Sequence, residues 1–329
     1  MATYKEIFGT NIEVVASDPA NPVTGQVWYN STDNVVKGSV FQAASWATGG
    51  NLNTSRNSLA GAGTRDAALA FGGRQPGQSS ATESYNGASW TTVNSLNTGR
   101  SSLTSFGTQT SAIGAGGYQP SPPYLRTDVE SWNGTSWTSV TGLGTARYGF
   151  AGAGTQTSGL VTGGMITFPN TSGGETESWN GSAWTEVNDL NTARRQLAGA
   201  GTDNTSAIAF GGFTASAVTN VETWNGTSWT EITDINTARL ALAGAGIQTA
   251  ALAFGGSDPG STGVTGVTEE WNGTSWTEVS DLNTARSDLA GDGPSTTDAF
   301  GAGGYSTAIT NATEEWTGAG NVTQTFTDS

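Results

Sequence analysis

The chain has 329 residues, a formal net charge of −15, 48 glycines, and neither cysteine nor histidine. The missing thiols and imidazoles exclude disulfides, Cys or His metal centres, and any catalysis that depends on either side chain. The acidic balance argues against nucleic-acid binding, which needs clustered Lys and Arg, and twelve regularly spaced tryptophans predict a folded chain rather than Gly-rich disorder. We expect an all-β protein with no cofactor and no metal.

The first 37 residues do not repeat elsewhere in the chain. They lack the basic region and apolar run of a secretory signal, and no stretch of the sequence approaches the roughly 20 apolar residues of a membrane span. Residues 18–22 (Asp-Pro-Ala-Asn-Pro) are typical of a linker, and residues 25–37 predict a β-hairpin. We therefore expect an N-terminal arm over 1–37 and a repeat domain over 38–329. The arm either packs on the outside of the repeat domain or anchors it to a neighbouring subunit.

From about residue 38 the chain repeats one unit. Each unit contains an Asn-Thr-Ala-Arg element, a Leu-Ala-Gly-Ala-Gly stretch, an apolar run ending in Gly-Gly, a variable loop, and a Trp-Asn-Gly-Thr-Ser-Trp segment, with small variations. The Gly-Gly doublets begin at Gly72, Gly116, Gly163, Gly211, Gly255 and Gly303. The arginines lie at Arg56, Arg100, Arg147, Arg194, Arg239 and Arg286. Two independent markers therefore keep one period of 44 to 48 residues.

Each part of the unit predicts a strand or a turn. The alternating small residues suit an inner strand near a crowded axis, and the run Ala251 to Phe254 suits a strand buried on both faces. Asn225-Gly226 predicts a type I′ hairpin turn between strands rich in Trp and Thr. Four short strands per unit predict the blade of a β-propeller, and paired tryptophans such as Trp132 and Trp137 are expected to fill the space between adjacent blades rather than stack on a ligand. Each would contribute about 1.5–3 kcal/mol on burial.

The Gly-Gly doublet, an aromatic residue about a dozen positions later, and a Trp five residues beyond it together resemble the kelch repeat. The resemblance runs from about residue 38 to the C-terminus and implies a kelch-type propeller of four-stranded blades. Kelch units often carry a His after the Arg, which this chain lacks. The copper site of kelch-fold oxidases, built from His, Tyr and a Cys-linked Tyr, is likewise excluded.

The two ends of the repeat region predict how a ring of six blades would close. Residues 45–53 align with 275–283, so an outer strand precedes the first complete unit, whereas residues 320–324 after Trp316 lack the outer-strand Trp. We expect the strand near Trp46 to complete the last blade, which removes open sheet edges. The alternative is a divergent seventh blade drawn from residues 1–50.

One Arg and one Glu recur in every unit. The glutamates, each two residues before the first aromatic residue, are Glu83, Glu130, Glu177, Glu222, Glu269 and Glu314. Repetition around a ring predicts ion pairs that hold each blade to its neighbour or to its loop. The alternative is a ring of ligand pockets between blades; six-bladed fucose-binding lectins pair Arg, Glu and Trp in this way with a different motif. Because no unit has a special pair of acids, glycoside hydrolysis is disfavoured, and we expect no enzyme.

The variable loops are expected to project from one face and to be the first place to look for binding. They span residues 74–81, 118–127, 165–175, 213–219 and 257–266.

The Gly-Gln-Val-Trp-Tyr-Asn-Ser segment starting at Gly25 resembles segments of bacteriophage tail and appendage proteins, especially marine ones. That resemblance implies a non-enzymatic structural or host-interaction protein of a virion, bound to other virion proteins through the arm and to a host glycan or protein through the loops. A carbohydrate-binding lectin with pockets between blades is the alternative, and a glycan-processing enzyme is a distant third. Neither nucleic acid nor membrane insertion is expected, and homo-oligomerisation is left open.

Overall fold

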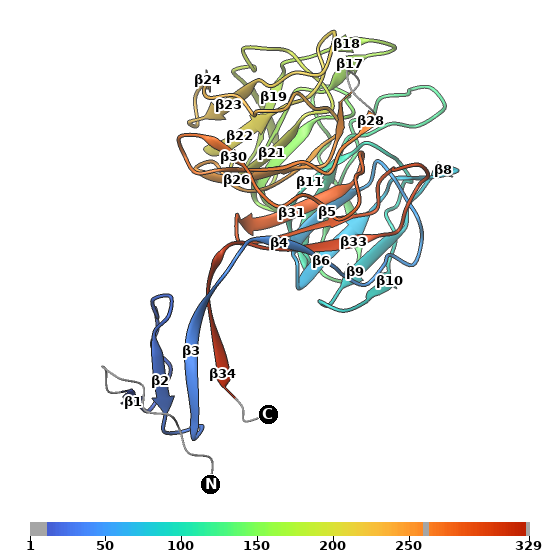
Figure 1. Ribbon diagram of the computed structural model, residues 1–329. Helices are drawn as coiled ribbons and strands as arrows, with labels where there is room; N and C mark the ends of the chain where they lie inside the picture. Colours follow the sequence, from blue (N-terminus) through green and yellow to red (C-terminus); the bar gives the residue numbers. More distant parts are fainter. Residues whose placement is uncertain (1–11, 259–262, 327–329) are drawn as a thin grey trace. The chain divides into compact units, whose positions relative to one another are not determined.

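The computed structural model describes residues 12–258 and 263–326, and these residues form strands and turns without any helix. Within the described ranges the strands make seven four-stranded sheets and three two-stranded ones (Figure 1). The chain divides into two compact units. Unit 1 comprises Met1–Ala44 and Gly318–Ser329, and unit 2 comprises Ser45–Thr317.

Unit 1 is a single four-stranded sheet in the order β1 (Glu13–Val15), β2 (Val27–Asn30), β3 (Val35–Gln42) and β34 (Gly320–Phe326). The β2–β3 hairpin confirms the prediction for residues 25–37. The expected boundary at residue 37 is not where the chain divides. Strand β34 pairs antiparallel with β3 along its whole length, so residues 38–44 and the C-terminal segment belong to unit 1. Residues 1–11 of the predicted arm lie outside the described residues.

Unit 2 contains six four-stranded sheets, numbered here in chain order, within its described residues. Sheet 1 consists of β5 (Ala60–Thr64), β6 (Ala67–Phe71), β9 (Thr82–Tyr85) and β10 (Trp90–Val93). Sheet 2 consists of β11 (Thr104–Thr108), β12 (Ser111–Ala115), β13 (Val129–Trp132) and β14 (Trp137–Val140). Sheet 3 consists of β15 (Ala151–Thr155), β16 (Ser158–Thr162), β19 (Thr176–Trp179) and β20 (Trp184–Val187).

Sheets 4 to 6 repeat this plan. Sheet 4 consists of β21 (Ala198–Asp203), β22 (Ser206–Phe210), β23 (Val221–Trp224) and β24 (Trp229–Glu231). Sheet 5 consists of β25 (Ala243–Ile247), β26 (Ala250–Phe254), β29 (Thr268–Trp271) and β30 (Trp276–Glu278). Sheet 6 consists of β31 (Ala290–Ser295), β32 (Asp298–Ala302), β33 (Thr313–Thr317) and β4 (Ser45–Thr48).

Strand β4 joins two parts of the chain that are far apart in sequence. It pairs antiparallel with β33, and Trp46 faces Trp316, which is the partnership expected for the strand near Trp46. The first strands of the sheets are neighbours in the order β5, β11, β15, β21, β25 and β31, and β31 also lies beside β5 (Figure 1). This repeated all-β arrangement is compatible with a β-propeller.

The apolar core lies between successive sheets. The Trp137 ring of sheet 2 lies 4.6 Å from the Phe71 ring of sheet 1, and its indole N–H donates to Thr82 Oγ1 across the same boundary at 3.0 Å. A Cβ added to Gly244 of the inner strand β25 would come within 2.7 Å of the Phe210 ring of sheet 4, so the small inner-strand residues make room for the neighbouring sheet's aromatic side chains. The predicted packing role of the tryptophans is therefore confirmed.

The Asn-Gly turns differ from the prediction. Trp224 pairs with Trp229, which leaves a four-residue connection rather than a two-residue type I′ turn. Asn225 Oδ1 accepts hydrogen bonds from the backbone N–H groups of Thr227 and Ser228, both at 2.9 Å, and of the Asn-Gly pair only Gly226 has a positive φ. The side chain of Asn, rather than a positive φ at that residue, closes the turn.

Candidate binding face

Every predicted Arg and Glu of the repeat belongs to a buried ion pair. The pairs are Arg56–Glu83, Arg100–Glu130, Arg147–Glu177, Arg194–Glu222, Arg239–Glu269 and Arg286–Glu314, with N–O distances from 2.5 to 3.2 Å. All six arginine side chains have 0% exposure. The structure thus brings together each Arg and Glu that the sequence singled out.

The pair in sheet 5 shows what these residues do. Arg239 lies in the segment that enters the sheet; its Nη1 donates to the carbonyls of Gly255 at 3.0 Å and Val267 at 2.6 Å. Glu269 on β29 accepts hydrogen bonds from the backbone N–H of Asn236 at 2.6 Å and from its side-chain amide at 2.7 Å. Burial lowers the pKa of the Arg239 guanidinium, which the nearby carboxylate opposes. Each pair therefore ties an entering segment to its own sheet, and a buried guanidinium is closed to ligands from solvent.

The Gly-Gly doublets connect each sheet to the next. Gly256 donates its N–H to the carbonyl of Arg286 at 2.9 Å, and Gly304 of sheet 6 donates to the carbonyl of Arg56, before sheet 1, at 2.8 Å. Gly255 and Gly256 have φ angles of 64° and 105°, and a Cβ on Gly255 would stand 2.7 Å from the Arg286 carbonyl oxygen. Only glycine allows this close approach in the left-handed region. The Gly-Gly doublet therefore does more than end a strand: it allows the backbone to contact the segment that enters the next sheet.

A second set of residues, two positions after each Arg, surrounds a central pocket. These residues are Ser58, Ser102, Gly149, Gln196, Ala241 and Asp288, and all have φ between 52° and 62°. Each donates its backbone N–H to the carbonyl of the preceding member at 2.6 to 2.9 Å, and Ser58 donates to Asp288. The six hydrogen bonds therefore link the last residue of the set, Asp288, back to the first, Ser58.

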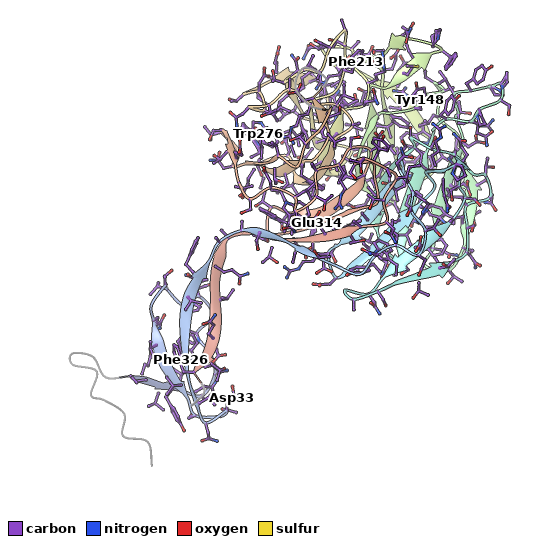
Figure 2. The ribbon with its side chains drawn as sticks, turned by 45° about the vertical axis from the view of Figure 1, so that its right-hand side comes forward. Asp33, Tyr148, Phe213, Trp276, Glu314 and Phe326 are labelled. Carbon is purple, nitrogen blue, oxygen red and sulfur yellow. The ribbon has the colours of Figure 1, made fainter. Side chains whose placement is uncertain are left out.

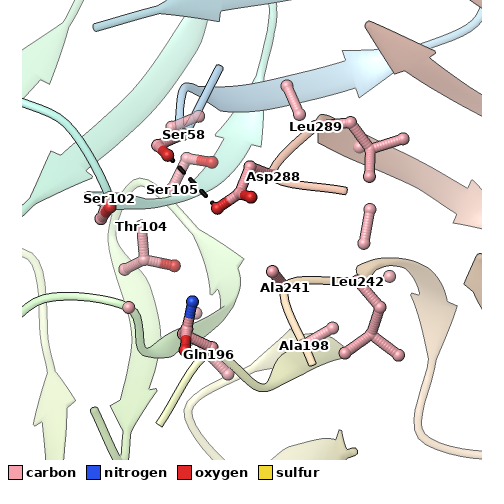
Figure 3. A pocket seen from close by; sticks show the side chains of 18 of the residues that line it. Ser58, Ser102, Thr104, Ser105, Gln196, Ala198, Ala241, Leu242, Asp288 and Leu289 are labelled. Atoms are coloured by element: carbon pink, nitrogen blue, oxygen red, sulfur yellow. Dashed lines mark hydrogen bonds between the residues drawn. The ribbon is translucent and has the colours of Figure 1, made fainter. Parts of the chain in front are cut away.

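The pocket inside this set has a volume of about 140 Å³ and is lined by the starts of all six sheets (Figure 3). The Asp288 carboxylate accepts hydrogen bonds there from Ser58 Oγ at 3.3 Å and Ser287 Oγ at 3.0 Å, and burial raises its pKa. A second pocket of about 240 Å³ lies farther along the inner strands and is lined in part by Asp292 and Phe106. Burial raises the pKa of Asp292 to about 7, against hydrogen bonds from the N–H groups of Gly63 and Gly293.

The variable loops begin at a fixed backbone frame. In each unit the residue after the Arg forms a β-bridge with the residue after the Gly-Gly doublet. The bridges are Asn57–Arg74, Ser101–Tyr118, Tyr148–Met165, Arg195–Phe213, Leu240–Ser257 and Ser287–Tyr305. Six equivalent places thus hold twelve side chains that differ between units, and Figure 2 shows two of them, Tyr148 and Phe213.

Three of the predicted loops contain small hairpins. These are β7 (Arg74–Gln75) with β8 (Gly77–Gln78), β17 (Met165–Thr167) with β18 (Thr171–Ser172), and β27 (Ser257–Asp258) with β28 (Gly263–Val264). Residues 259–262 of the last loop lie outside the described residues. The sequence analysis did not predict the sixth loop, which begins at Tyr305, or a role for the residue after each Arg. Their signal was present, because they are variable positions beside a repeated Arg or Gly-Gly.

Comparison with known proteins adds the fold alone. No protein-family model matches the chain, and no curated protein matches it. The solved structure of YjhT superposes with a TM-score of 0.67 at 13% sequence identity, covering 83% of this chain and 99% of that one. At this identity the likeness concerns architecture. The described part of the chain also has no helix that is long and apolar enough to cross a membrane.

Proposed function

We propose that unit 2 is a six-bladed kelch-type propeller, closed by β4 as the outer strand of its last blade. Three observations support this: the neighbour relation of β31 and β5, the hydrogen bonds that run through all six positive-φ residues, and the contact of Gly304 with Arg56. Each of these joins sheet 6 to the segment that enters sheet 1. A closed ring would leave no open sheet edge in unit 2.

The function that this geometry supports best is non-enzymatic recognition by a component of a phage particle. One observation is decisive for this proposal. The repeated Arg and Glu residues are buried in ion pairs with each other, whereas the residues that differ between units lie on the six equivalent β-bridges where the variable loops begin. A rigid scaffold with variable side chains at equivalent places is typical of binding proteins. The partner is a host surface component.

Unit 1 supplies the attachment to other virion proteins. Among the residues that the structure describes, unit 1 holds most of the exposed large apolar side chains: Ile12, Val14, Val23, Phe41 and Phe326. Val14 and Val23 are 68% and 67% exposed. Several exposed large apolar residues within one small unit suit a contact with another protein. The Gly25–Ser31 resemblance to tail and appendage proteins points in the same direction.

The alternative, a lectin with pockets between blades, has less support. Its candidate residues were the repeated arginines and glutamates, and these side chains are buried and satisfied by one another and by the backbone. A glycan-binding function at the loops does not need them and falls within the recognition proposal.

Particle association tests the proposal. Mass spectrometry of purified particles from a phage that encodes the chain should detect it, and the double variant Val23→Asp, Phe41→Asp should lose incorporation. The matched control is Tyr305→Ser, an exposed loop residue of unit 2, which should be incorporated normally. Hydrogen exchange of the backbone amides that pair β3 with β34 checks that the double variant keeps the fold of unit 1. Absence from particles, or normal incorporation of a folded double variant, would contradict the proposal.

A further inference from the structure

Three aromatic rings are stacked at the loops of sheets 2 and 3. The Phe168 ring lies 4.7 Å from Tyr124 and 6.5 Å from Tyr118, with interplanar angles of 27° and 25°. Tyr148 meets the edge of Tyr118 at 5.5 Å and 65°. Phe168 is 47% exposed, and the three tyrosines are partly exposed. The stack therefore presents aromatic surface to solvent beside the polar ends of its tyrosines.

Arg195 extends this cluster toward sheet 4. Its guanidinium lies over the Phe213 ring at 4.5 Å, and its Nη1 donates to Ser172 Oγ at 3.0 Å on the hairpin that carries Phe168. Burial raises the pKa of Tyr148, and the positive charge of Arg195 opposes part of that rise. None of the ion pairs among the described residues includes Arg195.

The backbone holds these side chains in fixed positions. Tyr118 forms β-bridges with Ser101 and Leu125, and Phe213 forms bridges with Arg195 and Ala217. Residues anchored on β-bridges lose less conformational freedom on binding than residues of a flexible loop. The aromatic band is defined here as Tyr118, Tyr124, Tyr148, Phe168 and Arg195. β-Bridges hold the backbones of Tyr118, Tyr148 and Arg195, and the rings of Tyr124 and Phe168 stack on each other.

We propose that the aromatic band binds an oligosaccharide, an inference that rests on the proposed recognition function and specifies its ligand. Flat rings can stack on the C–H faces of pyranose sugars, while the arginine and the tyrosine hydroxyls can bond to sugar oxygens. A protein partner is less well matched, because a specific protein interface uses about 20–30 residues on each side, whereas the band has five. Among the described residues of unit 2, Phe168 and Tyr305 are the only exposed large hydrophobic side chains.

The test uses the full chain and a printed array of neutral and uronic-acid-containing bacterial oligosaccharides. Wild-type protein should bind a subset of these glycans, and calorimetric titration with the best of them should give a dissociation constant that rises about 10-fold or more in Phe168→Ala and in Arg195→Ala. The control Tyr305→Ala, an exposed aromatic side chain on the loop of sheet 6, should change it less than about 2-fold. Thermal unfolding of each variant checks that its fold is retained.

Two outcomes of this test would overturn the inference. The first is that the wild-type protein binds no glycan of the array at millimolar concentration, and the second is that folded Phe168→Ala and Arg195→Ala variants bind the glycan as tightly as wild type. A second assay compares particle binding to host cells treated with periodate, which oxidises sugars, or with protease. Loss only after protease would identify a protein partner and overturn the glycan assignment, while leaving the recognition proposal in place. Conversely, glycan binding by a chain absent from particles would contradict the virion role alone.

Discussion

Removing one carboxylate from a buried ion pair should destabilise unit 2 strongly. Glu269→Ala leaves the Arg239 guanidinium, which has no exposed surface, without its counter-charge at 2.9 Å. It also removes the acceptor for the backbone and side-chain N–H groups of Asn236 and for the backbone N–H of Thr237. Breaking a buried pair typically costs about 3–5 kcal/mol, since a charge remains buried and uncompensated. We expect a loss of about 4 kcal/mol and a fall in Tm of about 10 °C.

Urea titration followed by tryptophan fluorescence measures this loss, and a surface ion pair provides the control. Arg65 Nε and Asp66 Oδ2 are 3.5 Å apart, with side chains 30% and 69% exposed, so Asp66→Ala should change the free energy of unfolding by less than about 0.5 kcal/mol. The double variant Arg239→Met, Glu269→Leu should lose less than the two single variants together, because neither charge is left buried alone. A Glu269→Ala protein within about 1 kcal/mol of wild type would refute the structural role of the pairs. If such a protein also lost glycan binding, the ligand-pocket alternative would be favoured.

Three further predictions concern single positions. Gly144 stands where the other five units have Asn, so Gly144→Asn, by adding a side-chain amide donor near Glu177, should raise the unfolding free energy by about 0.5–1.5 kcal/mol in urea titrations; a decrease would contradict this. Trp137→Ala should cost about 3–5 kcal/mol and more than the equivalent Trp184→Ala, because Trp184 is only partly buried; equal losses would argue against packing between sheets. The pKa of Asp292 is raised from 3.8 to about 7, so the folded state holds its proton more tightly, and its contribution to stability is lost as pH rises from about 4 to 7. Subtracting the pH profile of Asp292→Ala from that of wild type should isolate this loss, and a difference that is flat or of opposite sign would refute it.

The strand plan of the repeat could be predicted from the amino-acid sequence. Its period of 44 to 48 residues, the small residues of the inner strands and the tryptophans predicted four-stranded units whose faces are buried against one another. The pairing of the Trp46 strand with the last unit followed from its similarity to residues 275–283. These predictions succeeded because each depends on a local pattern that recurs, so that each unit tests the others. The Asn225-Gly226 turn failed because a side-chain hydrogen bond replaced the backbone conformation that the dipeptide usually indicates.

The roles of individual residues depend on tertiary packing. The sequence placed Arg239 and Glu269 at equivalent points of a repeat, but their burial depends on how the entering segment folds onto the sheet. The sequence could not show that residues 320–326 pair with β3 rather than with a strand of the repeat. This segment lacks the repeat motif, so no other unit indicates which strand it pairs with. Nor could it show the aromatic band, whose members come from separate units about one period apart. Contacts between non-repeating side chains arise from the packing of whole sheets, and no local pattern in the chain encodes them.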